Sequence, residues 1–340
     1  MSTALAFVFV FGLLTIFHEL GHFVMAKRAG VLVEEFGVGF GPKLWGRSLG
    51  ETVYSVRLFP LGGFVKMLGE DDDLGVDNER SFRRQPPGKR LLVIGAGPLM
   101  NFILAVLLFA IIFFLVGVPT PGAEVGAVIP GSPADNAGIK PGDKIMAIED
   151  VKVKTWEEMI EQIAPRAERE TKIMLTRNTR NISIELTPER TPEGDRGVIG
   201  IQRAMKAHRP LASLYYGARQ TLGTTIFIIS RVVEMVIQRQ PTDVAGPVGI
   251  VQVVGEVART GFINLLTLAA ILSVNLGLFN LFPIPLLDGG QLVLIAWEGI
   301  RGKGLGPEQE GAFKLIGVLL LLALLVLATY QDLKRLGLGV

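Results

Sequence analysis

Long runs of apolar residues constrain this chain more than any other feature. Residues 1–17 carry no charged side chain, and the first run continues through Ala26. Further runs lie at 91–118, 262–287 and 315–330. A transmembrane helix needs about 20 mainly apolar residues, and these runs reach or approach that length. Four such runs predict a polytopic membrane protein rather than a soluble protein with buried helices.

The composition agrees with a membrane protein. Of 340 residues, 49% are hydrophobic and 19% are charged, whereas a soluble domain has about 25% charged residues. The formal net charge is only +2, so the chain lacks the basic excess of a nucleic-acid-binding protein, and we expect no nucleic-acid partner. Because the sequence has no cysteine, disulfides, cysteine-ligated zinc and a cysteine nucleophile are excluded.

The apolar runs and the polar stretches between them predict a helical membrane fold with about four transmembrane helices, a β-hairpin and an inserted α+β domain. The hairpin is predicted from 52–59 and 64–68, which flank a Pro-Leu-Gly-Gly turn. The expected order is a first transmembrane helix at 1–29, a loop with the hairpin at 30–90, a second transmembrane helix at 91–118, the inserted domain at 119–203, an amphipathic interfacial region at 204–261, a third transmembrane helix at 262–290, a loop at 291–312 and a fourth transmembrane helix at 313–332.

Basic residues indicate the orientation of the chain in the membrane. Lysine and arginine are frequent between residues 27 and 90 and absent before them. Short cytoplasmic loops carry such an excess, so we expect the loop at 30–90 in the cytoplasm and the domain at 119–203 outside. Lys334 and Arg335, near the C-terminus, weakly oppose this arrangement.

Residues 211–237 leave two alternatives open. The stretch is apolar at helical spacing, but it carries Arg219, Arg231 and Glu234. This pattern favours an amphipathic helix that lies in the membrane interface. A fifth transmembrane helix is the competing interpretation.

An HExxH motif, His18-Glu19-Leu20-Gly21-His22, lies within the first apolar run. Residues i and i+4 share one face of a helix, so both imidazoles can bind one zinc ion. Glu19 lies beside them, where it could take a proton from a zinc-bound water as general base. A charged group in a membrane helix costs about 2.5–3.5 kcal/mol on insertion scales, and a metal would offset that cost. The alternative is three satisfied polar residues at a helix end near the interface.

A catalytic zinc site usually has a third protein ligand, and Asp288 is the best candidate. It follows Pro283 and Pro285, which prevent regular helix there. With four spans, Asp288 reaches the depth of the two histidines on the cytoplasmic side. A fifth span at 211–237 would place it on the opposite side, so the site favours four spans. His208, in the segment expected outside, is a poorer candidate.

Residues 119–203 have the alternating pattern of a small α+β domain. A helix is predicted to begin after Thr155, with Glu158 completing a capping box. Ser132-Pro133-Ala134 and Pro141-Gly142-Asp143 resemble the PDZ family. PDZ domains bind an extended peptide as an added strand, so this resemblance implies a peptide ligand or a size filter. A spacer that binds nothing is the alternative.

Together these motifs resemble the bacterial site-2 protease family, and more closely its zinc metalloproteases of regulated intramembrane proteolysis with a single PDZ domain. The resemblance rests on HELGH (18–22), GFGP (39–42), AGPLMN (96–101), the PDZ-like insert and NLFPIPLLDGG (280–290), and it covers nearly the whole chain. It implies a zinc-dependent intramembrane endopeptidase of the bacterial cytoplasmic (inner) membrane. The substrates that it implies are transmembrane segments of membrane proteins, notably anti-sigma factors and signal-peptide remnants.

The same resemblance implies a role for individual residues. His18, His22 and Asp288 would bind Zn²⁺, and Glu19 would be the catalytic base. Asn280 would hold the substrate or stabilise the oxyanion. An interhelical hydrogen bond is the alternative role for Asn280.

For the loop at 30–90, the resemblance implies a re-entrant β element that pairs with an unwound substrate, and a plain interfacial hairpin is the alternative. Two other classes of function compete with a protease. One is a non-enzymatic membrane scaffold with a degenerate metal site, and the other is a metal transporter. The transporter does not explain the position of Glu19 beside the two histidines.

Overall fold

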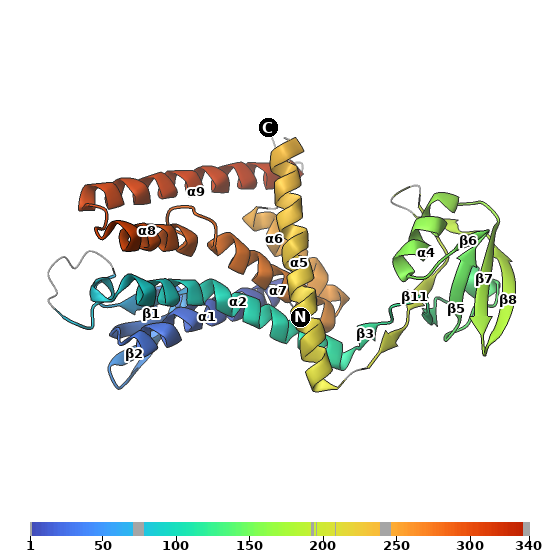
Figure 1. Cartoon of the computed structure of the whole chain (residues 1–340), viewed down its shortest axis with the longest axis horizontal. Coiled ribbons are helices and arrows are strands. Elements are labelled where there is room, and N and C mark those ends of the chain that lie inside the picture. The colour runs from blue at the N-terminus through green and yellow to red at the C-terminus, as the bar shows by residue number, and fades with distance from the viewer. Residues whose placement is uncertain are drawn as a thin grey trace. The chain divides into compact units, whose positions relative to one another are not determined.

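The structure is a computed structural model that describes residues 2–70, 78–191, 194, 196–207, 209–238 and 246–335 (Figure 1). It divides into two compact units, one formed by Met1–Ile112 with Leu214–Val340 and the other by Phe113–Ser213. The helices are α1 (Thr3–Ala29), η1 (Phe82–Arg84), α2 (Pro87–Leu115), α3 (Pro133–Asn136), α4 (Trp156–Ile163), η2 (Ala164–Arg166), α5 (Pro210–Gln238), α6 (Pro247–Thr260), α7 (Phe262–Asn280), α8 (Asp288–Arg301) and α9 (Pro307–Arg335). The strands are β1 (Val33–Leu49), β2 (Thr52–Met67), β3 (Val118–Pro119), β4 (Val125–Val128), β5 (Lys144–Ile148), β6 (Val151–Lys152), β7 (Thr171–Arg177), β8 (Arg180–Leu186), β9 (Glu189–Arg190), β10 (Gly197–Val198), β11 (Ile201–Arg203) and β12 (Met205–Lys206).

Four of the described helices are long and apolar enough to cross a membrane, namely α1, α2, α7 and Glu308–Arg335 of α9. The chain is therefore a multi-pass membrane protein, as the sequence predicts. The long helix α5 does not meet the same criterion among the described residues.

Helices α1 and α2 approach each other closely because glycines lie on both helices where the two are in contact. A Cβ atom on Gly21 of α1 would lie 2.2 Å from the carbonyl oxygen of Ala96 in α2. A Cβ atom on Gly97 of α2 would lie 2.2 Å from Nε2 of His22. Small residues allow membrane helices to pack at such short range. The two motifs HELGH and AGPLMN are thus parts of one helix–helix contact.

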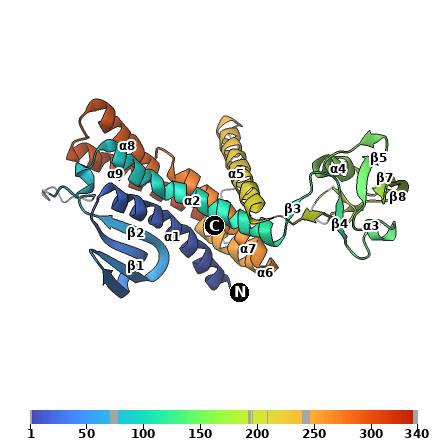
Figure 2. The ribbon, with the colours of Figure 1, turned by 60° about the horizontal axis from the view of Figure 1, so that its bottom comes forward.

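Strands β1 and β2 form the predicted β-hairpin beside α1, but its pairing differs from the prediction (Figure 2). The segments 52–59 and 64–68 do not pair with each other. Instead, Glu35 of β1 is aligned with both Val53 and Lys66 of β2, so the start of β1 lies between the two segments. The glycines at 37, 39 and 41 weaken the strand signal of β1 in the sequence.

The third predicted span ends earlier than 290, because α7 stops at Asn280. Pro283 and Pro285 follow, and Leu286 has a φ of +75°, a conformation that does not continue a helix. Helix α8 then begins at Asp288 and runs to Arg301, where the sequence predicts a loop at 291–312. The break between α7 and α8 places Asp288 at the first position of a new helix.

Glycines also fix the start of α8. A Cβ atom on Gly289 would lie 2.2 Å from the Phe282 carbonyl oxygen, and one on Gly290 would lie 2.3 Å from the Ile284 carbonyl oxygen. Larger residues at either position would push α8 away from the turn. The glycines after Asp288 therefore hold the helix start against the broken segment.

The last span, α9, is joined to α6 by a buried carboxylate. Asp332 accepts hydrogen bonds from the backbone N–H of Gly246 and of Gly249, each at 2.9 Å. A carboxylate at this place caps the N-terminus of α6 and satisfies amides that the helix leaves free. A Cβ atom on Gly246 would lie 2.6 Å from Asp332, which explains the glycine before Pro247.

The second unit contains the predicted α+β domain. Its largest sheet has the order β6-β5-β7-β8, and β4 pairs with β11 beside it. Helix α4 begins after Thr155, whose Oγ1 accepts a hydrogen bond from the N–H of Glu158 at 3.2 Å. Ile145, Ile173 and other apolar side chains form one buried core.

Candidate metal centre and active site

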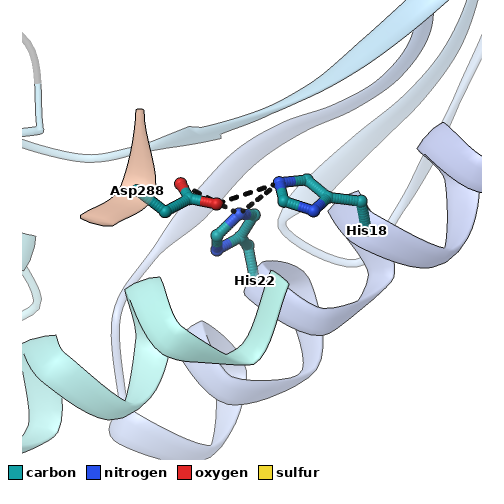
Figure 3. Close-up of side chains that lie close together, drawn as sticks. All are labelled: His18, His22 and Asp288. Atoms are coloured by element: carbon teal, nitrogen blue, oxygen red, sulfur yellow. Dashed lines mark hydrogen bonds and ion pairs between the residues drawn. The ribbon is translucent and has the colours of Figure 1, made fainter. Parts of the chain in front are cut away.

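Two distant parts of the chain bring three metal-binding side chains together (Figure 3). Helix α1 places His18 and His22 one turn apart on its buried face, and Asp288 enters from the start of α8. Nε2 of His18 lies 3.2 Å from Oδ2 of Asp288, and Nε2 of His22 lies 3.6 Å from Oδ1. The two Nε2 atoms are 3.1 Å apart. All three predicted ligands thus meet at one point.

The donor set fits a metal ion. The candidate ligand atoms of His18, His22 and Asp288 all lie within 4.8 Å of one another. Oδ2 of Asp288 is buried and, apart from its 3.2 Å approach to Nε2 of His18, has no hydrogen-bond partner among the described residues. Two imidazole nitrogens and a carboxylate oxygen are ligands that zinc accepts in catalytic sites.

Contacts with residues of α2 orient the two imidazoles. Nδ1 of His22 lies 3.0 Å from the backbone carbonyl oxygen of Val93. Nδ1 of His18 lies 3.0 Å from Nδ2 of Asn101, another residue of α2. Each histidine therefore has one ring nitrogen held by α2 and the other directed at Asp288.

The three side chains line a cavity of about 210 Å³. Glu19 lines it as well, and its Cγ would lie 2.9 Å from a Cβ atom on Gly63 of β2. Phe64 and Val65 of β2 form another part of the wall. The cavity therefore joins the HExxH motif to a strand of the hairpin.

Two other residues were considered from the sequence, and the structure describes one of them. Asn280 is half-buried at the end of α7 and does not line the cavity. His208 lies outside the described residues. The structure therefore brings Glu19 to the metal ligands but does not bring Asn280 to them.

Sequence reasoning assigned no individual role to the residues of α2 that contact the histidines. Asn101 enters the sequence analysis only as part of the motif AGPLMN. The carbonyl group of Val93 cannot be recognised from sequence, because every residue has a backbone carbonyl group. One signal was available, because Asn101 is a polar residue within a long apolar run. A buried polar residue in such a helix indicates a specific partner.

Comparison with known proteins identifies the family. Residues 6–324 match the family described as Peptidase family M50. The zinc metalloprotease RasP of Bacillus licheniformis is 34% identical, over 99% of this chain and 100% of that protein. The regulator of sigma-W protease RasP of Bacillus subtilis is 32% identical, over 99% of each chain. A putative zinc metalloprotease of Clostridium acetobutylicum is 38% identical, over 96% of this chain and 95% of that protein.

Among solved structures, the PDZ domain of the SdrC-like protein of Listeria monocytogenes is similar to part of the chain. It is 26% identical and covers 26% of this chain and 93% of that domain, with a TM-score of 0.23. The match to the family extends from α1 to α9 and includes the three side chains that converge on one point. This chain is a member of peptidase family M50.

Proposed function

We propose that this chain is a zinc-dependent endopeptidase that cuts transmembrane segments of other membrane proteins. The observation that carries the proposal is the convergence of His18, His22 and Asp288 within a bundle of membrane-spanning helices. These ligands would hold one zinc ion through two nitrogens and one oxygen. A zinc ion bound there would polarise the scissile carbonyl group and lower the pKa of a bound water toward about 7.

Glu19 is the proposed general base. It lies next to His18 on α1 and lines the same cavity, so its carboxylate can accept a proton from a water molecule held there. It can then return that proton to the leaving amine. Residues of α1, α2 and β2 line the cavity around this carboxylate.

The edge of the hairpin offers a way to bind an unwound substrate. Residues 63–67 of β2 pair with β1 on one side, and Gly63, Phe64, Val65 and Met67 line the cavity. A peptide bond in a helix is protected by its own hydrogen bonds, so it must be exposed before hydrolysis. A substrate strand beside 63–67 would have its freed backbone groups satisfied by pairing.

The orientation follows from the basic residues around the hairpin. Arg57, Lys66 and Arg80 belong to the loop between the first two spans, and such loops stay in the cytoplasm. We therefore place the active site toward the cytoplasmic side of the bacterial inner membrane and the second unit outside. There the PDZ-like domain would bind a peptide or admit only substrates that have already been shortened.

The substrate class rests on the relatives. One of them is named as a regulator of sigma-W protease, and we infer that this chain likewise cuts membrane-bound anti-sigma factors or signal-peptide remnants.

The role of Asn280 in holding the substrate or the oxyanion stays a prediction. Its position at the end of α7, shortly before the break that leads to Asp288, is compatible with a contact to a bound substrate.

The test compares purified wild type with Glu19→Gln, in detergent or in liposomes. Both proteins should bind zinc, because Glu19 is not a proposed ligand. Only the wild type should cut a model transmembrane helix, with a loss of at least about 100-fold in Glu19→Gln. Equal cleavage by the two proteins would remove Glu19 from its assigned role, and metal flux without cleavage would favour a transporter.

A further inference from the structure

Asn101 is a completely buried polar residue in the middle of α2, with an exposed fraction of 0%. Its Nδ2 atom lies 3.0 Å from Nδ1 of His18. Its Oδ1 atom is buried and has no hydrogen-bond partner among the described residues. One end of the amide thus contacts a proposed metal ligand, while the other end makes no hydrogen bond to the described residues.

The chemistry of a neutral imidazole decides which end of the amide serves a metal site. A neutral histidine that binds a metal through Nε2 carries its proton on Nδ1, so Nδ1 must donate a hydrogen bond. For His22 the acceptor is the carbonyl oxygen of Val93, 3.0 Å away. For His18 the corresponding position is occupied by Asn101, and only the Oδ1 end of an amide can accept.

A half-turn of the amide about its last side-chain bond exchanges Oδ1 and Nδ2 with little change of shape. With Nδ2 facing it, neutral His18 accepts at Nδ1 and holds its proton on Nε2, which then donates to Oδ2 of Asp288, 3.2 Å away. With Oδ1 facing it, His18 holds its proton on Nδ1 and turns the free electron pair of Nε2 toward Asp288 and His22. An amide can therefore pair with either form of the ring.

We propose that Asn101 is a positioning residue of the metal site, whose Oδ1 accepts the Nδ1–H of His18 when a metal is bound. The inference rests on the proposed metal site and adds the residue that fixes one of its ligands. Groups of this kind orient a histidine ligand and hold its proton on the ring nitrogen away from the metal. Removing such a group typically lowers metal affinity by about 10- to 100-fold.

The backbone of α2 at this position is held separately from the amide. Oγ of Ser273 in α7 donates a hydrogen bond of 2.8 Å to the backbone carbonyl oxygen of Asn101. This contact involves the backbone of Asn101 and neither its amide side chain nor His18. Ser273→Ala is therefore a matched control, because it disturbs the packing around Asn101 and leaves its side chain in place.

The main test measures zinc affinity by competition with a chromophoric chelator, using the full-length protein in detergent. Asn101→Leu keeps the size of the side chain but lacks the acceptor, and we expect about 10- to 100-fold weaker zinc binding. Asn101→Asp keeps an acceptor and should bind zinc at least as tightly as the wild type. Ser273→Ala should match the wild type. Wild-type affinity in Asn101→Leu, or an equal loss in Asn101→Asp and Asn101→Leu, would overturn the inference.

A second measurement needs no variant at Asn101. The chain has only three histidines, so ¹⁵N nuclear magnetic resonance of histidine-labelled protein gives few signals, and comparison with His208→Gln separates those of His208 from those of the two proposed ligands. In the zinc-loaded wild type, Nδ1 of His18 should give the signal of a protonated nitrogen. An unprotonated Nδ1 would overturn the role of Asn101. Failure of the wild type to bind zinc at all would instead remove the proposed metal site, and the role of Asn101 with it.

Discussion

Helices α2 and α9 have the same length of 29 residues, and their most apolar 18-residue stretches have almost the same hydropathy, yet the two helices are packed very differently. In the most apolar 18-residue stretch of α2, 44% of the residues are buried inside the protein, whereas in the corresponding stretch of α9 only 6% are. The difference follows from the side chains. Helix α2 carries Gly97 and Asn101 on its packed face, whereas the central part of α9 is a run of leucine and other aliphatic residues.

The comparison shows that hydropathy predicts which segments cross a membrane but not which of them build the site. Lipid tails are as apolar as leucine, so an apolar surface alone does not drive two membrane helices together. Small residues and specific polar contacts do so. Helix α2 uses them to hold the two histidines, and α9 is fixed at a few points, of which Asp332 is one.

The largest effect is expected from a side chain added on the packed face of α2. In Gly97→Ala the new Cβ atom would lie 2.2 Å from Nε2 of His22, so the imidazole must leave its place. We expect loss of bound zinc and a loss of proteolytic activity of at least about 100-fold. Leu322→Ala on α9 is the control, because Leu322 is 54% exposed. Normal zinc content in Gly97→Ala would contradict the close contact between α1 and α2.

A smaller effect is expected where α9 is attached. Asp332→Ala removes the acceptor for the amides of Gly246 and Gly249. The loss of a helix cap of this kind costs about 0.5–2 kcal/mol. Hydrogen exchange at these two amides should accelerate while the zinc content stays unchanged. Unchanged protection of both amides would show that α9 is not attached to α6 through this carboxylate.

The smallest effect concerns a buried aspartate of the second unit. Burial alone would raise the pKa of Asp143, but hydrogen bonds from Arg177 and from the N–H of Lys140 outweigh it, so the pKa is lowered. A carboxyl group with a lowered pKa stabilises the fold above its ordinary pKa of about 3.9, and this contribution is lost as the pH falls through the lowered value.

The stability of the second unit should therefore decrease below pH of about 4. Because the first unit also titrates in acid, the measurement compares thermal unfolding of wild type with Asp143→Asn as a function of pH. The variant should be less stable at pH 7 and should approach the wild type in acid. A constant difference between the two proteins at every pH would contradict this account of Asp143.

The sequence was sufficient for much of this fold because the membrane limits the possible structures. Apolar runs must form helices there, since only helices and closed barrels satisfy the backbone. The i, i+4 spacing of His18 and His22 places both on one face of a helix. The chemistry of zinc then pointed to Asp288 as the missing ligand, and the structure brings its carboxylate to them.

Other features could not be obtained from sequence because they depend on contacts between segments that are distant in the chain. The start of β1 lies between two segments of β2, and its glycines hide its strand character. The sequence predicts a third span that runs through 290 and a loop at 291–312, whereas a new helix begins at Asp288 and runs to Arg301, because the broken segment before it obscures where helix resumes. The contact of His18 with Asn101 joins residues of different helices and becomes visible only when α1 and α2 are packed.

The most direct test of the account is the zinc content of the purified protein and of Asp288→Ala. The central claim is that a carboxylate from α8 shares one metal ion with the two histidines of α1. We predict about one zinc ion per chain in the wild type and none, together with no proteolysis, in Asp288→Ala. A full complement of zinc and full activity in Asp288→Ala would contradict the claim.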